Sequence, residues 1–169
     1  EGVTVKGEVI RARVRRPDGS LPPLAQIIAV HRTPMRDVMG RIGRNSQNLF
    51  AECLLKHVGL RADQRAGVAD ARGGWDNGAR AVIDALRRNG VEVASLNIAD
   101  GSGLSRANRC TARQLAATLS WMHRSPLGAL LRESLSEPGE EGSLKSMSKD
   151  LADRVQAKTG TMNGIRALA

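Results

Sequence analysis

The side chains best suited to take part in chemistry lie in two short groups that are far apart in the sequence. The first is Ser46-Gln47-Asn48, which carries a hydroxyl and a carboxamide two positions apart. The second is Lys158-Thr159-Gly160, a cation followed by a hydroxyl and a glycine. These groups donate and accept hydrogen bonds and supply positive charge. Each group is a weak pattern by itself, because Ser46 and Asn48 are typical helix caps and Lys158 is typical of an exposed strand.

The first group is predicted to lie at the junction of two helices. Apolar residues recur with helical spacing from Met35 to Ile42, and then the segment 43–46 interrupts the pattern. The periodicity resumes at Leu49 and stops near Gly59, so a second helix is expected between these residues. Ser46 or Asn48 is then available to cap the second helix.

The second group is predicted to lie on the first strand of a hairpin. Asn163-Gly164 is the strongest short-range signal for a two-residue hairpin turn. The flanking segments 154–161 and 165–169 are therefore expected to pair. This places Lys158, Thr159 and Gly160 on the first of the two strands.

The remaining segments alternate between predicted helices and loops. Two short strands broken near Gly7 are expected within 3–15, a polar loop over 61–74, and a short strand over 91–98. Helices are predicted from about Asp76 to Arg88 before Asn89-Gly90, from a capping box of Thr111 with Gln114, and from Ser125-Pro126 with Pro126 as the first helical residue.

The segment 100–106, Asp-Gly-Ser-Gly-Leu-Ser-Arg, reads as a tight glycine-rich turn. It is not a dinucleotide-binding fingerprint, because Arg106 stands where the last glycine of that pattern would be. We predict a structural turn with an internal ion pair between Asp100 and Arg106, and no catalytic role for either residue.

Composition excludes several classes of protein. The 169 residues carry a net charge of +9, and aromatic residues make up only 2% of them. The scarcity of aromatic side chains argues against stacking platforms for single-stranded nucleic acid, and a nucleic-acid partner would rest on the charge alone. No apolar run is long enough to cross a bilayer. Cys53 and Cys110 have no metal-ligand spacing, Cys53 is expected to be buried, and neither a metal nor a cofactor is predicted.

Three blocks in order narrow the interpretation: the segments 45–52, 100–106 and 158–164. Together they resemble the class C low-molecular-mass penicillin-binding proteins, the D-alanyl-D-alanine carboxypeptidase/endopeptidases, and the resemblance runs from about Val3 to Ala169. Ser46-x-Asn48 and Lys158-Thr159-Gly160 match the second and third signatures of penicillin-interacting serine enzymes. The resemblance implies an α+β fold of the β-lactamase/transpeptidase type, in which a helical cluster packs on an antiparallel sheet. The chain is expected to be the C-terminal portion of that domain, truncated at both ends.

The resemblance also implies roles for individual residues. Ser46 would relay a proton between a catalytic lysine and the leaving amine, and Asn48 would bind the peptide amide and orient that lysine. Lys158 would supply positive charge, while Thr159 and Thr161 would contact the terminal carboxylate of the substrate. Gly160 would leave room for a peptide along the strand, and the backbone N–H of Thr161 is a candidate for the oxyanion hole. The implied partners are peptidoglycan stem peptides ending in D-Ala-D-Ala and β-lactams, met in the periplasm or outside the cell.

One signature of the family is missing from its expected place. The nucleophile motif S-x-x-K should precede Ser46, and residues 1–45 contain no such motif. Ser146-Met147-Ser148-Lys149 is a match, but it lies after the first group and just before Lys158, so we interpret it as coincidental. The nucleophile is therefore expected upstream of these residues, and this chain alone is expected to be inactive. The alternative is an inactive homologue that binds peptidoglycan as a scaffold.

Overall fold

The computed structural model describes residues 6–7, 19–21, 29–139, 142–152 and 154–169. The chain divides into two compact units, residues 1–32 and residues 33–169. The predicted strands within 3–15 lie outside the described residues, except for the described pair 6–7. Every residue of the predicted site belongs to the second unit.

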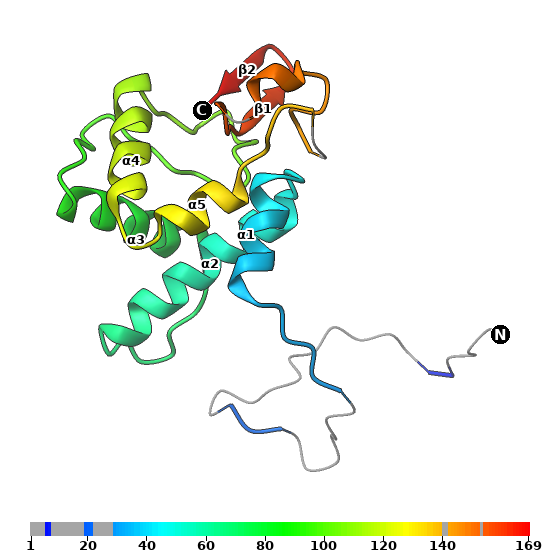
Figure 1. The fold of residues 1–169 in the computed structure, drawn as a ribbon. Helices are drawn as coiled ribbons and strands as arrows, with labels where there is room; N and C mark the ends of the chain where they lie inside the picture. Colours follow the sequence, from blue (N-terminus) through cyan, green and yellow to red (C-terminus); the bar gives the residue numbers. More distant parts are fainter. Residues whose placement is uncertain (1–5, 8–18, 22–28, 140–141, 153) are drawn as a thin grey trace. The chain divides into compact units, whose positions relative to one another are not determined.

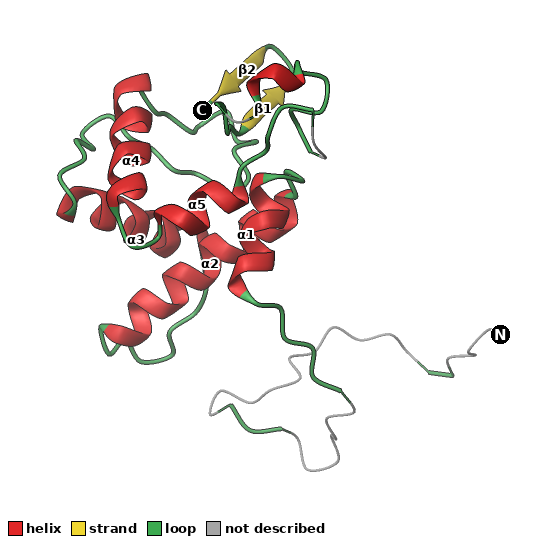
Figure 2. Cartoon of the chain, in the orientation of Figure 1, coloured by secondary structure: helices red, strands yellow, loops and turns green. Residues whose placement is uncertain are grey.

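The described part of the second unit contains five α-helices, one 3-10 helix and one pair of strands (Figures 1 and 2). Along this part of the chain the α-helices come first and the strands last. The elements are α1 (Met35–Gly43), α2 (Asn48–Arg65), α3 (Trp75–Arg88), α4 (Ala112–Arg124), α5 (Gly128–Ser134), η1 (Lys149–Leu151), β1 (Thr159–Met162) and β2 (Ile165–Leu168).

Helix α2 is longer than its sequence pattern predicts. It continues through Gly59 to Arg65, so the helix end expected near Gly59 and the loop expected from residue 61 are both wrong. Gly59 is instead a contact point with α3: a Cβ there would stand 2.5 Å from Asn77 Oδ1, and one on Gly78 would stand 2.4 Å from the Leu55 carbonyl oxygen. The two glycines let the helix backbones approach closely, and this packing outweighs the low helix propensity of glycine.

The other helices follow local signals more closely. Helix α3 ends before Asn89 as predicted, and α4 begins with the predicted capping box: Thr111 Oγ1 accepts from the Gln114 N–H at 3.1 Å, and the Thr111 N–H donates to Gln114 Oε1 at 2.9 Å. Helix α5 begins at Gly128, so the predicted start at Pro126 is wrong by two residues.

Two further expectations are wrong. The strand predicted over 91–98 is reduced to an isolated bridge between Asn97 and Arg109. The nearby N–H groups of Ala94 and Ala99 donate to the side chains of Glu92 and Asn108 instead of to a second strand. Cys53 lies on an exposed side of α2 and not in the core, and Cys110 is exposed as well.

The hairpin forms at the predicted turn, but its first strand is shorter than the predicted segment 154–161. Strand β1 begins at Thr159, Lys158 bonds to Ala169 just before it, and Ala157 bonds to Ser136 instead. Strand β1 pairs with β2 in antiparallel register, and Met162 and Ile165 flank the Asn163-Gly164 turn. Gly164 adopts φ +79°, the left-handed conformation that glycine adopts at least cost. The predicted α+β class, helices with a small antiparallel sheet, is therefore confirmed.

Candidate active site

Ser46 occupies a sharp corner between α1 and α2. Its φ of +53° lies in the left-handed region, which is unfavourable for a residue with a side chain. The corner turns the chain so that the Gln47 N–H bonds the Arg41 carbonyl of α1 at 3.0 Å. Asn48 then begins α2. Both Ser46 and Asn48 are exposed.

The expected capping role of Ser46 or Asn48 is wrong. The N-cap of α2 is Gln47, and no side chain caps this end of the helix. Among the described residues, the Asn48 carboxamide has no hydrogen-bond partner, so it is available to a ligand. The Ser46 hydroxyl has a partner from the other end of the chain.

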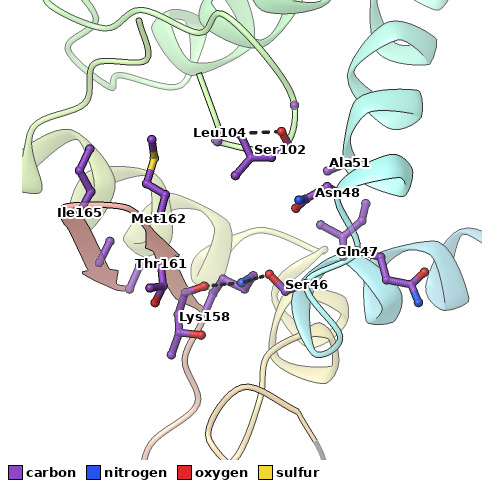
Figure 3. A pocket seen from close by; sticks show the side chains of 17 residues that line it. Ser46, Gln47, Asn48, Ala51, Ser102, Leu104, Lys158, Thr161, Met162 and Ile165 are labelled. Atoms are coloured by element: carbon purple, nitrogen blue, oxygen red, sulfur yellow. Dashed lines mark hydrogen bonds between the residues drawn. The ribbon is translucent and has the colours of Figure 1, made fainter. Parts of the chain in front are cut away.

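That partner is Lys158. Its Nζ donates a hydrogen bond to Ser46 Oγ at 2.8 Å and a second one to the carbonyl oxygen of Thr159 (Figure 3). The structure thus brings together the two groups singled out from the sequence. Because the ammonium donates to the hydroxyl oxygen, the proton of Ser46 is left to point toward another acceptor.

Backbone hydrogen bonds on both sides hold Lys158 in place. The preceding residue, the buried Ala157, exchanges two 3.0 Å hydrogen bonds with Ser136. Lys158 itself exchanges two with Ala169, at 2.7 and 3.1 Å. Ser136 is fully buried, and its hydroxyl reaches the Arg44 carbonyl, two residues before Ser46, at 3.4 Å. One buried serine therefore contacts the segments that lead into both groups.

The pairing of Lys158 with Ala169 fixes which backbone groups of β1 remain open. In an antiparallel pair, hydrogen-bonded and non-hydrogen-bonded positions alternate along the strand. Lys158, Gly160 and Met162 bond to the partner segment, so the N–H and C=O groups of Thr159 and Thr161 face away from β2. Within the described residues, the sheet has only these two strands, so this edge of β1 is open.

The site has three walls: the corner between α1 and α2, strand β1, and the glycine-rich loop over 100–106. Asp100 organises it: its carboxylate accepts hydrogen bonds from the Gly103 N–H at 2.7 Å, the Ser105 N–H at 2.5 Å and the Asn108 side chain at 3.0 Å. The predicted structural turn is confirmed. The ion pair predicted inside it is wrong, because the Arg106 guanidinium extends to the carbonyl oxygen of Asn163 at the hairpin turn, at 3.0 Å.

These three walls enclose a cavity of about 460 Å³. All six residues predicted for the site line it: Ser46, Asn48, Lys158, Thr159, Gly160 and Thr161. Figure 3 shows the Ser46 and Lys158 side chains meeting, with Asn48 and Ser102 nearby. Sequence reasoning did not assign the apolar part of the lining, to which Leu104, Met162 and Ile165 contribute, although Leu104 lies in a turn that it did identify.

Burial lowers the pKa of Lys158 from its ordinary value of 10.5, because the partly desolvated ammonium loses hydration.

The motif interpreted as coincidental lies elsewhere: neither Ser146 nor Lys149 is among the residues that line the cavity. Lys149 begins η1, and its aliphatic stem packs against Gly139. The described residues contain no group of three or more side chains suited to a metal ion. None of the described helices combines the length and the apolar character that crossing a bilayer requires.

Comparison with known proteins places the site in context. The family model described as the D-Ala-D-Ala carboxypeptidase 3 (S13) family matches residues 1–169. A D-alanyl-D-alanine carboxypeptidase of Actinomadura sp. (strain R39) is 34% identical over 99% of this chain, and the D-alanyl-D-alanine carboxypeptidase DacB of Haemophilus influenzae is 27% identical over 88% of it.

A solved structure agrees with the sequence relatives. Penicillin binding protein 4 (dacB) of H. influenzae, in a complex with a β-lactam, superposes with a TM-score of 0.68 at 26% identity and covers 80% of this chain. The chain spans about a third (31%) of the length of each of these relatives and of this structure. The predicted resemblance to penicillin-binding carboxypeptidases is confirmed: the chain belongs to the D-Ala-D-Ala carboxypeptidase 3 (S13) family.

Proposed function

We propose that this chain forms part of the active site of a serine-type D-Ala-D-Ala carboxypeptidase/endopeptidase that acts on peptidoglycan stem peptides and is acylated by β-lactams. The observation that carries the proposal is the 2.8 Å contact between Lys158 Nζ and Ser46 Oγ, in a cavity that Asn48 and β1 also line. The chain spans about a third of its relatives, so we further propose that the rest of the protein supplies the nucleophile serine and its lysine.

In this proposal, the peptide lies in extended form along the open edge of β1. The outward N–H group of Thr159 and the outward N–H and C=O groups of Thr161 pair with it as an added strand would, while the Thr159 carbonyl accepts from Lys158 Nζ. Thr161 N–H is then a candidate donor to the oxyanion that forms when the serine attacks the scissile carbonyl. The threonine hydroxyls and the Lys158 ammonium bind the terminal carboxylate.

Ser46 acts as the proton relay. The nucleophile serine gives its proton to its lysine and forms an ester bond with the peptide carbonyl. The C–N bond then breaks, and the leaving amine of D-alanine takes a proton from Ser46, which recovers one from the lysine. Lys158 promotes this step, because an ammonium that donates to Oγ makes the Ser46 hydroxyl more acidic. Water then hydrolyses the ester, and the enzyme is regenerated. Asn48 binds the peptide amide.

The experiment that tests the function uses the full-length protein that carries this sequence. Intact mass and peptide mapping are compared before and after benzylpenicillin is added. An adduct on a serine outside these 169 residues is the expected result. An adduct on Ser146 would overturn the interpretation of that motif as coincidental. A folded protein without any adduct would contradict the proposal and favour an inactive scaffold. The family's substrate also implies a periplasmic or exported protein, which cell fractionation would test.

The lowered pKa of Lys158 predicts the alkaline limb of the pH profile. As pH rises through that lowered pKa, the ammonium is lost, and with it the donor to Ser46 and the charge that attracts a carboxylate. The specificity constant kcat/KM for a D-Ala-D-Ala peptide is therefore expected to decrease as pH rises, and the midpoint of this alkaline limb is expected to lie below 10.5. In Lys158→Arg, this limb is expected to move upward, because arginine stays charged beyond about pH 12. Lys149→Arg, outside the cavity, is the control, and an unmoved limb in Lys158→Arg would contradict the assignment.

Gly160 offers a test that separates substrate binding from folding. A Cβ at this position would meet only the Cβ of Ala167, at 3.7 Å, which is an ordinary contact. Gly160→Ala is therefore expected to change the free energy of unfolding by less than about 1 kcal/mol. It is expected to lower the rate of acylation by about tenfold or more, because the methyl group occupies space beside the peptide. Acylation at the wild-type rate would contradict binding of the substrate along β1.

A further inference from the structure

Glu52 joins the helix that carries Asn48 to the loop on the other side of the cavity. It lies on α2, one turn after Asn48. Its carboxylate accepts hydrogen bonds from the Gly101 N–H at 3.2 Å, the Ser102 N–H at 3.1 Å and Trp75 Nε1 at 2.7 Å. The loop donors stand 49 and 50 residues away in the sequence, so these bonds join separate elements.

The loop backbone lies directly on α2 at this point. A Cβ on Gly101 would stand 2.4 Å from the Ala51 carbonyl oxygen, so only glycine allows this approach. The bonds that Asp100 accepts, from Gly103, Ser105 and Asn108, stay within the loop and shape it. Glu52 instead fixes where the loop sits relative to the helix.

The Glu52 carboxylate is held as an anion. Burial by itself would raise its pKa, but hydrogen bonds from the Ser102 and Trp75 side chains and from the backbone N–H groups of Gly101 and Ser102 bring it down to about 2. With a pKa of about 2, the carboxylate stays ionised near neutral pH, where a group that exchanges a proton needs a pKa closer to neutrality.

We propose that Glu52 is a positioning residue that sets the separation between Asn48 and the cavity wall formed by Ser102, Gly103 and Leu104. This proposal rests on the proposed function. Asn48 and Glu52 lie on the same rigid helix, so the hydrogen bonds that Glu52 accepts from the loop fix the position of the opposite wall relative to Asn48. Glu52 does not line the cavity, so it acts through the loop and not on the substrate.

The variant Glu52→Gln tests this role in the full-length protein. The amide keeps the size of the side chain but replaces one acceptor oxygen with a donor that faces N–H groups. For a D-Ala-D-Ala peptide, KM is expected to rise by about tenfold to a hundredfold, while kcat changes by less than about threefold, because the groove is displaced and the reacting groups are not. The pH profile is expected to keep its shape. Loss of an acidic limb would overturn the proposal, because Glu52 would then be exchanging a proton.

The matched control is Asp63→Asn on the same helix. Asp63 also accepts hydrogen bonds from a neighbouring element, α3, with Asn77 at 2.7 Å and Arg80 at 3.2 Å, but it is not among the residues that line the cavity. Both variants are expected to lower Tm, whereas only Glu52→Gln is expected to raise KM. Equal KM values in the two variants would overturn the role of Glu52.

A second variant keeps the test decisive if Glu52→Gln fails to fold. Gly101→Ala leaves Glu52 in place but pushes the loop away from the Ala51 carbonyl, so it is expected to raise KM in the same way. An unchanged KM in Gly101→Ala would overturn the proposal. A wild-type protein that benzylpenicillin does not acylate would overturn the proposed function itself, whereas wild-type acylation with an unchanged KM in Glu52→Gln would overturn only the role of Glu52.

Discussion

Replacing Ser46 with glycine is expected to stabilise the protein and inactivate it in a single step. The left-handed backbone at φ +53° costs a residue with a Cβ about 1 kcal/mol, and glycine avoids that cost. The same change removes the hydroxyl that accepts from Lys158 and would relay the proton. Acylation by benzylpenicillin is therefore expected to fall by about 10² to 10⁴, the range for general acid–base catalysis. Thermal unfolding and acylation rates are measured on the same samples.

Ser46→Ala is the control for this experiment. It removes the hydroxyl but keeps the Cβ, so it is expected to lose the same activity without the gain in Tm. A Ser46→Gly protein that is acylated at the wild-type rate would exclude the relay. A glycine variant less stable than the alanine variant would show that the left-handed corner carries no strain. A corner that destabilises the fold while serving the chemistry is typical of functional sites.

The second large effect is expected at Asn48. Its carboxamide is exposed, does not cap α2 and has no partner among the described residues, so Asn48→Ala is expected to change the free energy of unfolding by less than about 0.5 kcal/mol. Acylation by benzylpenicillin is expected to fall by about 10² to 10³, comparable to the loss of one oriented donor in other hydrolases. The measurement pairs acylation kinetics with denaturant unfolding.

Asn89 provides the opposite case in the same chain. It is also exposed, but its Nδ2 donates to the Ala85 carbonyl at 2.8 Å at the end of α3. Asn89→Ala is expected to lower stability and leave acylation unchanged. Wild-type acylation in Asn48→Ala, or a drop in Tm as large as that of Asn89→Ala, would contradict the role assigned to Asn48.

The sequence predicted most accurately the helix caps, helix ends and turns that depend on residues close together in the chain. The Thr111 capping box, the end of α3 at Asn89 and the Asn163-Gly164 turn each involve residues no more than a few positions apart. The hairpin in turn placed Lys158 beside the strand that lines the cavity. All six predicted site residues therefore gathered at one cavity, although their chemical roles stay predictions.

What the sequence could not provide depends on contacts between distant segments. The sequence pattern predicts a helix end near Gly59, and only the contact of Gly59 with α3 explains why α2 continues past it. The sequence predicts an ion pair between Arg106 and Asp100, but the Arg106 guanidinium donates instead to the carbonyl oxygen of Asn163 in the hairpin turn. The role of Glu52 has no local signal in the sequence, since its donors lie 23, 49 and 50 residues further along the chain.

The open edge of β1 has a consequence for colloidal behaviour. An unpaired strand edge can join any other extended chain, including a second copy of itself, and is a common starting point for aggregation. The edge that would hold a peptide cannot be covered without losing that use. Two features limit self-association here: β1 is only four residues long, and the Lys158 ammonium stands at its start. The proposed binding of peptides at this edge and a tendency to aggregate would thus both result from the same exposed backbone groups.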